Sequence, residues 1–272
     1  MTDLLTETAY AKINLALHVR ARRPDGYHEL ETLFAFAEDG DRIDGRKAEE
    51  ISLTISGPLA GSLGPDTDNL VLRAAHALKA GTGIAYGAAL HLEKHLPVAA
   101  GLGGGSADAA AALRLLARLW EIDADAPEIM QVAQSLGADV PACVLSQTCF
   151  GQGRGDALIP FDDPSLGGTP LLLANPGIAL ATGPVFAGWD QRDRGPLNPA
   201  EWRAGRNDLT ASATAMVPEI SALLTRLEGQ AGANFVRMSG SGASCFALFD
   251  SPEARDSAAG NIPFWHMASQ IR

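Results

Sequence analysis

The strongest constraint on the fold is a glycine-rich segment that runs directly into a stretch of helical periodicity, over residues 96–120. Glycine lacks a Cβ atom, so the main chain there can take positive φ and approach a ligand closely. The glycines concerned are Gly101, Gly103, Gly104 and Gly105. We expect Ser106 or Asp108 to cap the helix that follows. Free N–H groups at a helix start, together with the helix dipole, predict a phosphate-binding loop.

This loop differs from two familiar phosphate-binding signatures. A Walker A loop is excluded, because no Gly-Lys-Ser or Gly-Lys-Thr follows the glycines. The dinucleotide-binding fingerprint is disfavoured, since the glycines run together at 103–105 and no strand leads tightly into them. A flexible turn before an amphipathic helix is the alternative interpretation. The density of glycine, followed by Ser and Asp, favours phosphate binding.

Length and charge limit the classes of protein that this chain can belong to. Its 272 residues suffice for two domains or one large one. The 21 basic residues against 32 acidic ones give a formal net charge of −11. Nucleic-acid binding requires a basic surface, so we expect no nucleic-acid partner. A local pocket can still be positive and bind a small anion. We also expect no membrane association, because no apolar run is long enough to span a bilayer. The sequence gives no sign of an obligate protein partner, so none is expected.

Cysteine usage indicates the redox environment. The three cysteines, Cys143, Cys149 and Cys245, form no CxxC pair and no zinc pattern. We interpret them as small buried hydrophobic residues. Residues 1–7 lack the profile of a signal peptide. A cytoplasmic location is therefore expected.

A strand with two chemically different faces is predicted near the start of the chain, at residues 9–19. Apolar and polar residues alternate there with a period of two, as in a half-buried strand. Lys12, Asn14 and His18 share the second face, which either meets water or lines a site. The pattern by itself favours the solvated face.

A turn at residues 22–28 places an aromatic ring beside an imidazole. Its Pro-Asp-Gly sequence supplies the turn geometry, and Tyr27 and His28 follow directly. Such a pair suits stacking on a planar heterocycle and hydrogen bonding to it. A hydrophobic anchor beside an exposed histidine is the alternative, which the residues alone favour slightly.

Patterning predicts an alternation of short strands and helices over the rest of the chain. Further strands are expected at 30–36, 50–56, 88–94, 171–176, 233–238 and 245–249, and helices at 70–80, 128–136 and 218–227. Residues 61–68 and 190–199 read as loops, and Asp68 or Asn69 is expected to cap the first of these helices. The glycine-rich stretch 148–155 predicts a boundary between domains at 1–155 and 156–272.

Two further segments have both a structural and a functional interpretation. Asp139 precedes Pro141 at a predicted helix start, so it serves as an N-cap, as a general base, or as both. The small-residue loop at 239–244 is a tight hairpin or a second part of a site, and the two interpretations are equally supported.

Three of these motifs, taken together and in order, resemble the GHMP kinases. They are the strand with Lys12, the loop at 97–108 and the loop at 239–243. A finer resemblance is to the members that act on a cytidine diphosphate derivative in the non-mevalonate isoprenoid pathway. The segments that carry it are 11–15, 25–28, 137–141 and 207–209.

The resemblance implies an α+β, two-domain fold. A domain like the second domain of ribosomal protein S5 would pack against a ferredoxin-like C-terminal domain, with the active site between them. It also implies the reaction, which is transfer of the ATP γ-phosphoryl group to a tertiary C2 hydroxyl of the substrate. ATP and Mg²⁺ would be required, and Ser106 is the expected protein ligand of the ion.

The resemblance also implies roles for individual residues. Asp139 would take the hydroxyl proton, with Lys12 as its neighbour. Tyr27 and Phe186 would sandwich the cytosine, and His28 would read its polar edge. Lys94 would lie near the adenosine. The expected ATP-binding residues are Lys94, Pro97, Gly101, Leu102, Gly103, Gly104, Gly105 and Ser106. The expected substrate-binding residues are Asn14, Tyr27, His28, Thr182, Phe186, Ser239 and Gly240.

Three competing functions remain to be weighed. Another GHMP kinase, acting on mevalonate or homoserine, is disfavoured by Tyr27 and His28, because those substrates have no base to stack. A non-catalytic, ligand-binding member of the fold is disfavoured because Lys12 and Asp139 are both present. An S5-like nucleic-acid module is disfavoured by the net charge of −11.

Overall fold

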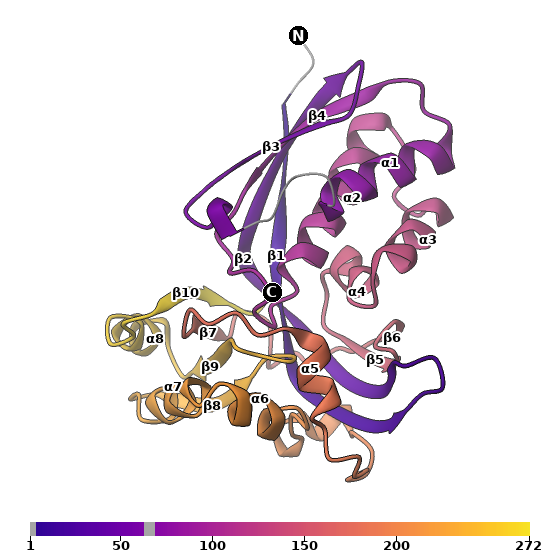
Figure 1. Cartoon of the computed structure of the whole chain (residues 1–272). Coiled ribbons are helices and arrows are strands. Elements are labelled where there is room, and N and C mark those ends of the chain that lie inside the picture. Colours follow the sequence, from indigo (N-terminus) through magenta and orange to yellow (C-terminus); the bar gives the residue numbers. More distant parts are fainter. Residues whose placement is uncertain (1–3, 63–68) are drawn as a thin grey trace. The chain divides into compact units, whose positions relative to one another are not determined.

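The computed structural model describes residues 4–62 and 69–272 (Figure 1). The expected loop at 61–68 and its possible cap Asp68 thus lie almost wholly outside the described residues. The chain forms two compact units. Unit 1 comprises Met1–Ala11, Asp39–Val98 and Gly103–Ser146, and unit 2 comprises Lys12–Glu38, Ala99–Leu102 and Gln147–Arg272. Within the described ranges, none of the helices combines the length and the apolar character needed to cross a membrane.

Two long strands contribute to both units, so the units are not two successive lengths of chain. Strand β1 is Leu5–Arg22, and strand β2 is His28–Ala48. Strand β2 contains the strand expected at 30–36 and is much longer. The two strands pair with each other. The domain boundary expected at residue 155 stays a prediction, because compact units that exchange segments do not define a single dividing residue.

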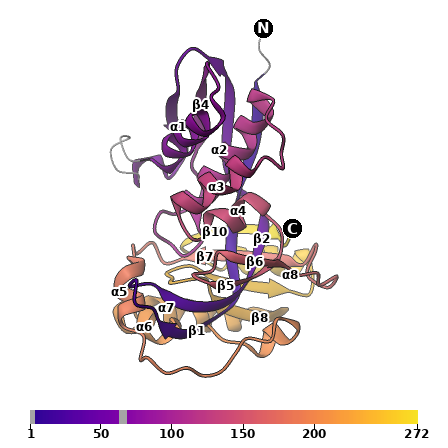
Figure 2. The same ribbon diagram turned by 90° about the vertical axis from the view of Figure 1, so that its right-hand side faces the viewer.

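Unit 1 combines a small sheet with four helices. Strand β4 (Gly87–Glu93) pairs antiparallel with β2 and parallel with β3 (Ser52–Ser56). The helices, which pack on one another, are α1 (Leu70–Thr82), α2 (Gly104–Trp120), α3 (Pro127–Leu136) and α4 (Val140–Leu145), and a short 3₁₀ turn η1 spans Ala60–Ser62. Figures 1 and 2 show the four helices gathered on one face of these strands.

Helix α2 is the centre of unit 1, because it is buried over most of its circumference. Its alanines, from Ala107 to Ala112 except for Asp108, let neighbouring helices approach closely, and Trp120 closes its far end by donating to Gly87 O at 3.3 Å. The helix begins after Gly103, whose φ of 64° is left-handed, and no side chain caps it. The expectation that Ser106 or Asp108 caps the helix is therefore wrong.

The other predicted helix starts of unit 1 differ in outcome. Asn69 caps α1, because its side chain accepts the Val71 N–H at 2.8 Å, as expected. Asp139 does stand at the start of α4, but its side chain makes no capping hydrogen bond. Asp139 is thus the N-cap residue of α4, as expected, although it does not cap the helix through its side chain.

Unit 2 contains a hairpin and a four-stranded antiparallel sheet. The first part of β2 pairs with β5 (Cys149–Gly153), and β5 pairs with β6 (Ala157–Pro160). The stretch 148–155, where the domain boundary was expected, therefore belongs to the β5–β6 hairpin. The sheet has the order β10–β7–β9–β8. These strands are β7 (Pro170–Asn175), β8 (Ala233–Met238), β9 (Cys245–Phe249) and β10 (Trp265–Gln270).

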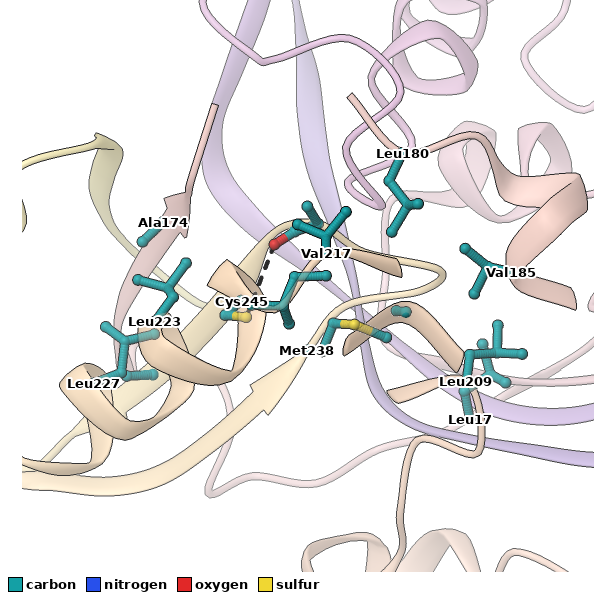
Figure 3. Close-up of a cluster of buried hydrophobic side chains, with 14 of the residues drawn as sticks. Leu17, Ala174, Leu180, Val185, Leu209, Val217, Leu223, Leu227, Met238 and Cys245 are labelled. Atoms are coloured by element: carbon teal, nitrogen blue, oxygen red, sulfur yellow. Dashed lines mark hydrogen bonds between the residues drawn. The ribbon is translucent and has the colours of Figure 1, made fainter. Parts of the chain in front are cut away.

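Short helices complete unit 2. They are α5 (Thr182–Ala187), the 3₁₀ helix η3 (Pro199–Ala204), α6 (Thr210–Met216), α7 (Glu219–Glu228) and α8 (Pro252–Ala259). Helix α7 packs against β8 and β9, and α8 packs against β7 and β10. Figure 3 shows part of the hydrophobic core of unit 2, to which α7 contributes Leu223 and Leu227 and the sheet contributes Met238 and Cys245.

The cysteines agree with their predicted role. Cys143, Cys149 and Cys245 are all free and buried. Burial raises the pKa of the Cys149 thiol to about 12, so this side chain stays protonated at neutral pH. The cytoplasmic location that the cysteines suggested stays a prediction.

Candidate active site

The polar face of β1 is buried and forms a connected network. Lys12 is 3 % exposed and Asn14 is 2 % exposed, so the expectation of a solvated face is wrong. The Lys12 Nζ donates to Asn14 Oδ1 at 2.9 Å, and Asn14 Nδ2 donates to Thr32 Oγ1 at 2.8 Å. Buried polar groups of this kind need partners, which β2 and distant loops supply here. The second interpretation, in which this face lines a site, is the one that remains.

His18, on the same face, is held as a neutral imidazole. Its Nε2 accepts the Arg206 N–H at 3.2 Å, and its Nδ1 lies 3.2 Å from Gly195 O. Burial, reinforced by Arg206, lowers the pKa of His18. The residue therefore supports the turn at 205–207 rather than offering a charge.

Two small-residue loops of unit 2 lie directly on each other. Ser239 Oγ donates to Gly101 O at 2.8 Å, and Ser244 N donates to Ala100 O at 3.0 Å. Gly101 has a φ of +77°, and a Cβ on it would lie 2.3 Å from Ser239 O, so only glycine fits. Asn207 Nδ2 holds the second loop by donating to Met238 O and Gly240 O, both at 2.8 Å. The loop at 239–244 thus acts as a support for the glycine-rich loop.

The glycines of the phosphate loop have two different functions. Gly101 and Gly103 take positive φ, as expected. Gly104 and Gly105, the first residues of α2, do not use this conformational freedom. Their N–H groups belong to a first helical turn, which leaves them without partners inside the helix. Ser106 follows in the same turn and is half-buried.

Lys94 occupies a position that the sequence does not suggest. Its side chain is 1 % exposed and pairs with two aspartates, Asp41 and, at 2.7 Å, Asp108. Burial opposes its charge, but Asp108 and Asp41 outweigh this effect and raise the pKa of Lys94. Burial raises the pKa of Asp108 to about 8. The ammonium group is thus enclosed by the side chains of Asp41 and Asp108, and the expected position of Lys94 near the adenosine stays a prediction.

Asp139 lies at the start of a short helix whose second residue is Pro141. It has helical φ and ψ of −82° and −18°, and it is half-buried. Its carboxylate makes no capping hydrogen bond to α4, and its role as a general base stays a prediction. Pro141 lacks an N–H, so it removes one donor that such a cap would have served.

An aromatic cluster in unit 2 surrounds the other predicted residues. The ring centroids of His28 and Phe186 are 5.0 Å apart, and Trp189 meets His28 edge-on at 5.8 Å. Burial, together with the charge of Arg22, lowers the pKa of His28. Tyr27 is 53 % exposed, and its N–H donates to Asp25 Oδ1 at 3.0 Å, which fixes the turn. The cluster therefore presents flat apolar surface beside a neutral imidazole.

Three residues of these clusters were missed by sequence reasoning. Trp189 follows Phe186 by three residues, a helical spacing that could have indicated it. Arg154 lies 5.0 Å above the Tyr27 ring and is held by Asp156, and no sequence signal points to it. Asp41 lies 53 residues before Lys94, so only the fold brings them together.

Thr182 lies where α5 begins, although Ala181, not Thr182, is the N-cap. Its hydroxyl is 3.1 Å from Ser241 Oγ, which links α5 to the loop at 239–244. The backbone of β1 also contacts the glycine-rich loop, because Leu102 O accepts the Lys12 N–H at 3.0 Å. Unit 2 thus brings six of the expected site residues together, namely Lys12, Asn14, Gly101, Leu102, Ser239 and Gly240. In unit 1, Lys94 lies under Gly104 and beside the turn that carries Pro97.

A dedicated metal cage is not part of the described structure. Among residues 4–62 and 69–272, no three His, Cys, Asp or Glu side chains come close enough to hold an ion together. Mg²⁺ in nucleotide sites commonly keeps several waters and takes only one or two protein ligands besides the phosphates. The Ser106 hydroxyl, in the first turn of α2, fits that mode of binding.

Comparison with known proteins defines the class. The model of the GHMP kinase N-terminal domain matches residues 69–147, and that of the GHMP kinase C-terminal domain matches residues 190–264. The chain belongs to the GHMP kinase family and is a small-molecule kinase of that family. Its two-domain α+β fold was expected from the sequence and is confirmed.

The relatives give a finer comparison. The chain is 56 % identical to the 4-diphosphocytidyl-2-C-methyl-D-erythritol kinase of Rhizorhabdus wittichii, covering 98 % of this chain and 94 % of that protein. It is 53 % identical to the kinase of the same name from Novosphingobium aromaticivorans, over 98 % and 93 % of the two chains. A crystal structure of 4-(cytidine 5′-diphospho)-2C-methyl-D-erythritol kinase matches with a TM-score of 0.84 at 33 % identity, covering 98 % of this chain and 99 % of that one.

Proposed function

We propose that this chain transfers the γ-phosphoryl group of ATP to the C2 hydroxyl of 4-diphosphocytidyl-2-C-methyl-D-erythritol, a step of the non-mevalonate isoprenoid pathway. Nearly full-length identity of 56 % to a kinase of that name supports it. The observation that carries it in the structure is the cluster of His28 and Phe186, with ring centroids 5.0 Å apart, beside the exposed ring of Tyr27. Mevalonate and homoserine contain no flat heterocycle that would use such a surface.

Phosphoryl transfer depends on positioning and charge stabilisation more than on covalent chemistry. The amides of residues 101–106 are proposed to hold the ATP phosphates, since the first turn of α2 offers unpaired N–H groups and the positive end of its dipole. Ser106 is the proposed protein ligand of Mg²⁺, which would neutralise part of the charge of the phosphates. Pro97 and Leu102 would shape the loop around the nucleotide.

Two residues are proposed to act on the reacting groups. Asp139 would accept the proton of the substrate hydroxyl or orient that hydroxyl. Lys12 would offset the negative charge of the transferring group, and its buried position strengthens any electrostatic interaction that it makes. Asn14 uses one lone pair for Lys12 and one N–H for Thr32, which leaves one of each for the substrate.

The base of the substrate is proposed to stack between Tyr27 and Phe186. His28 and Phe186 already touch at 5.0 Å, so no third ring fits between these two, and His28 belongs at the edge of the base. Thr182, Ser239 and Gly240 would line the same part of the site. Their hydrogen bonds within unit 2 support this proposal by fixing the loop that carries two of them.

The proposal is tested by substrate-dependent ATP turnover. The purified chain is incubated with ATP and Mg²⁺ together with the cytidine substrate, mevalonate or homoserine, and product phosphate is located by ³¹P NMR. We expect turnover only with the cytidine substrate, and a new monoester signal at the tertiary carbon. Turnover with mevalonate or homoserine alone would move the chain to another branch of the family, and ATP-independent ligand binding would make it a non-catalytic member.

A further inference from the structure

We infer that the side chains of Asp41, Lys94 and Asp108 form a buried clasp whose mutual hydrogen bonds, and not a contact of these side chains with the nucleotide, set the shape of the phosphate loop. These three residues, all in unit 1, are called the clasp below. The inference rests on the proposed function, because it assigns the clasp a positioning role for ATP. It assigns a role to the Lys94 side chain, and the expected position of this residue near the adenosine stays a prediction.

The clasp joins the two ends of the segment that carries the loop. Lys94 directly follows β4, whereas Asp108 lies in the second turn of α2. The Lys94 Nζ donates to Asp108 Oδ2 at 2.7 Å and also donates to Asp41 Oδ2. One ammonium group therefore ties the entry of the segment to its exit, and residues 95–107 form a loop closed at its base.

Asp41 holds the entry a second time. Its Oδ1 accepts the backbone N–H of Leu96 at 2.8 Å and that of His95 at 2.5 Å. The same carboxylate thus receives two main-chain donors and the ammonium group. Charge-assisted hydrogen bonds are among the strongest in proteins, and their direction fixes the first peptides of the loop as well as the lysine.

The backbone of Lys94 is fixed on its other side. Its N–H donates to Ser56 O at 2.8 Å, and its carbonyl accepts the Leu59 N–H at 3.2 Å. Gly57, at a φ of +100°, lets this strand approach so closely that a Cβ would lie 2.6 Å from Lys94 N. Lys94 therefore has little freedom to leave the clasp and reach a ligand.

The clasp lies immediately under the proposed phosphate cradle. A Cβ built on Gly104, the first residue of α2, would lie 3.7 Å from Lys94 Nζ and 3.8 Å from Pro97 O. The ammonium group of Lys94 and the carbonyl of Pro97 therefore both lie close to the first residue of α2. The amides of residues 104–106, which are among those proposed to bind phosphate, lie in this first turn of α2.

Stability alone does not account for such a cluster. The three side chains are 0 % (Asp41), 1 % (Lys94) and 3 % (Asp108) exposed, and taking charges out of water is so costly that apolar replacements are often neutral or stabilising. One atom, Asp108 Oδ1, is buried with no hydrogen-bond partner among the described residues, which adds to the cost. What the clasp does supply is direction, because its bonds are satisfied in one arrangement of the loop.

The test compares two substitutions of Asp108. Asp108→Asn keeps an acceptor for Lys94, so we expect its ATP dissociation constant to stay within about 3-fold of the wild-type value. Asp108→Leu removes the acceptor and leaves Lys94 paired with Asp41, and small misplacements in a site are costly, so we expect an increase of about 10-fold or more. Calorimetry with a non-hydrolysable ATP analogue measures both. The cytidine substrate should bind both variants within about 2-fold of wild type, because the clasp residues all belong to unit 1, whereas the residues proposed for the substrate belong to unit 2.

A matched control separates positioning from simple destabilisation. Leu116→Ala removes buried volume from the same helix without touching the clasp, so it should lower Tm but leave ATP affinity unchanged. If Asp108→Leu retains ATP affinity, or if Leu116→Ala at an equal loss of Tm weakens ATP binding as much, the clasp has no positioning role. If Asp108→Leu weakens the binding of ATP and of the cytidine substrate equally, the proposed role of the clasp in positioning the phosphate loop is overturned as well.

A second variant keeps the inference testable if Asp108→Leu does not fold. The Asp41 carboxylate accepts hydrogen bonds from Lys94 Nζ and from the N–H groups of His95 and Leu96. Asp41→Asn replaces one of its two oxygens with an NH₂ group, which cannot accept, so we expect the ATP dissociation constant to rise about 5-fold or more. Unchanged ATP affinity would overturn the inference. Failure of the proposed function is distinguished by the wild-type chain, which would then bind ATP but not phosphorylate the cytidine substrate.

Discussion

The clasp in unit 1 and the aromatic cluster in unit 2 are two regions built on different principles. The clasp consists of charged side chains that are at most 3 % exposed and bound by short, directional hydrogen bonds. The aromatic cluster, which comprises Tyr27, His28, Phe186 and Trp189, relies on ring contacts and leaves Tyr27 53 % exposed. The first arrangement tolerates almost no displacement, whereas the second tolerates adjustment of its rings.

This difference predicts how the two regions respond to mutation. A buried donor or acceptor that loses its partner incurs the full desolvation cost, so changes near the phosphate loop should have large effects on ATP binding and turnover. Stacking is weakly directional, so changes in the aromatic cluster should alter affinity and selectivity by smaller factors. The predictions below test this contrast, from the largest expected effect to the smallest.

The largest effect is expected at Asp139. Asp139→Asn keeps the shape of the side chain but removes its basicity, and loss of a general base typically lowers kcat by about 10²–10⁴-fold. We expect affinities for ATP and for the cytidine substrate to change little, because the substitution is isosteric. Single-turnover kinetics and calorimetry measure the two quantities separately. Asp125→Asn, an exposed acidic residue before α3, is the control and should behave as wild type. Near wild-type turnover of Asp139→Asn would remove this residue from the mechanism.

The next effect is expected at Gly101, where the two small-residue loops meet. Gly101→Ala puts a Cβ 2.3 Å from Ser239 O at a φ of +77°, so one of the loops must move. We expect ATP affinity to fall about 10–100-fold, since displacement of a positioned segment has costs of this order. Gly167→Ala, where a Cβ meets nothing within 4 Å, is the control. Unchanged ATP affinity in a folded Gly101→Ala protein would show that the contact between the loops does not position the cradle.

A smaller effect is expected at Tyr27. Base stacking on an aromatic ring contributes roughly 1–3 kcal/mol in nucleic-acid sites. Because Tyr27 is 53 % exposed, we expect Tyr27→Ala to lie near the low end, with KM raised about 5–10-fold for cytidine and uridine analogues alike. Tyr27→Phe retains the ring and should leave KM nearly unchanged. A larger increase for one of the two bases would indicate that Tyr27 reads the base rather than only stacking on it.

The sequence predicts local elements well where local rules decide them. Asn69 caps α1 as its side chain dictates, and the period-two pattern correctly identifies β1, β3 and β4. The prediction was wrong where distant residues decide the outcome. The polar face of β1 is buried because β2 and the loop at 239–244 cover it, and Ser239 is 225 residues from Asn14.

The site was predictable only as a set of residue types, not as an arrangement. The glycines, Lys12 and Asp139 were identified from local patterns, the resemblance supplied the roles of Lys12 and Asp139, and these roles stay predictions. The position of Lys94 could not be derived, because its partner Asp41 lies 53 residues away and a lone aspartate in a strand carries no signal. Asp108 was expected to cap a helix, but the left-handed Gly103 starts the helix earlier and leaves this carboxylate for Lys94.

The smallest effect concerns base selection by His28. Stacking accepts any base, so discrimination must come from hydrogen bonds to the base edge. A neutral imidazole has one hydrogen-bond donor and one acceptor. The acceptor nitrogen can accept a hydrogen bond from the amino group of cytosine, whereas uracil has a carbonyl at that position and offers no donor. His28→Asn should therefore lower the cytidine-to-uridine ratio of kcat/KM by only a few-fold, about 3-fold, since each partner remains able to bond to water.

The pH dependence of that ratio tests the same assignment independently. Burial and the charge of Arg22 lower the pKa of His28 below 6.5, so the folded state binds a proton less readily than the unfolded state. The neutral form, and the stability linked to it, are therefore fully present above about pH 6.5 and are lost as the pH falls through the folded pKa. Protonation replaces the acceptor with a second donor, so the cytidine-to-uridine ratio should be constant from pH 8 to about 6.5 and decline below that range. The ratio for His28→Asn should stay flat over the whole range, measured as kcat/KM for both analogues from pH 5.5 to 8. If the wild-type ratio does not decline, or if His28→Asn follows it, backbone groups rather than His28 read the base.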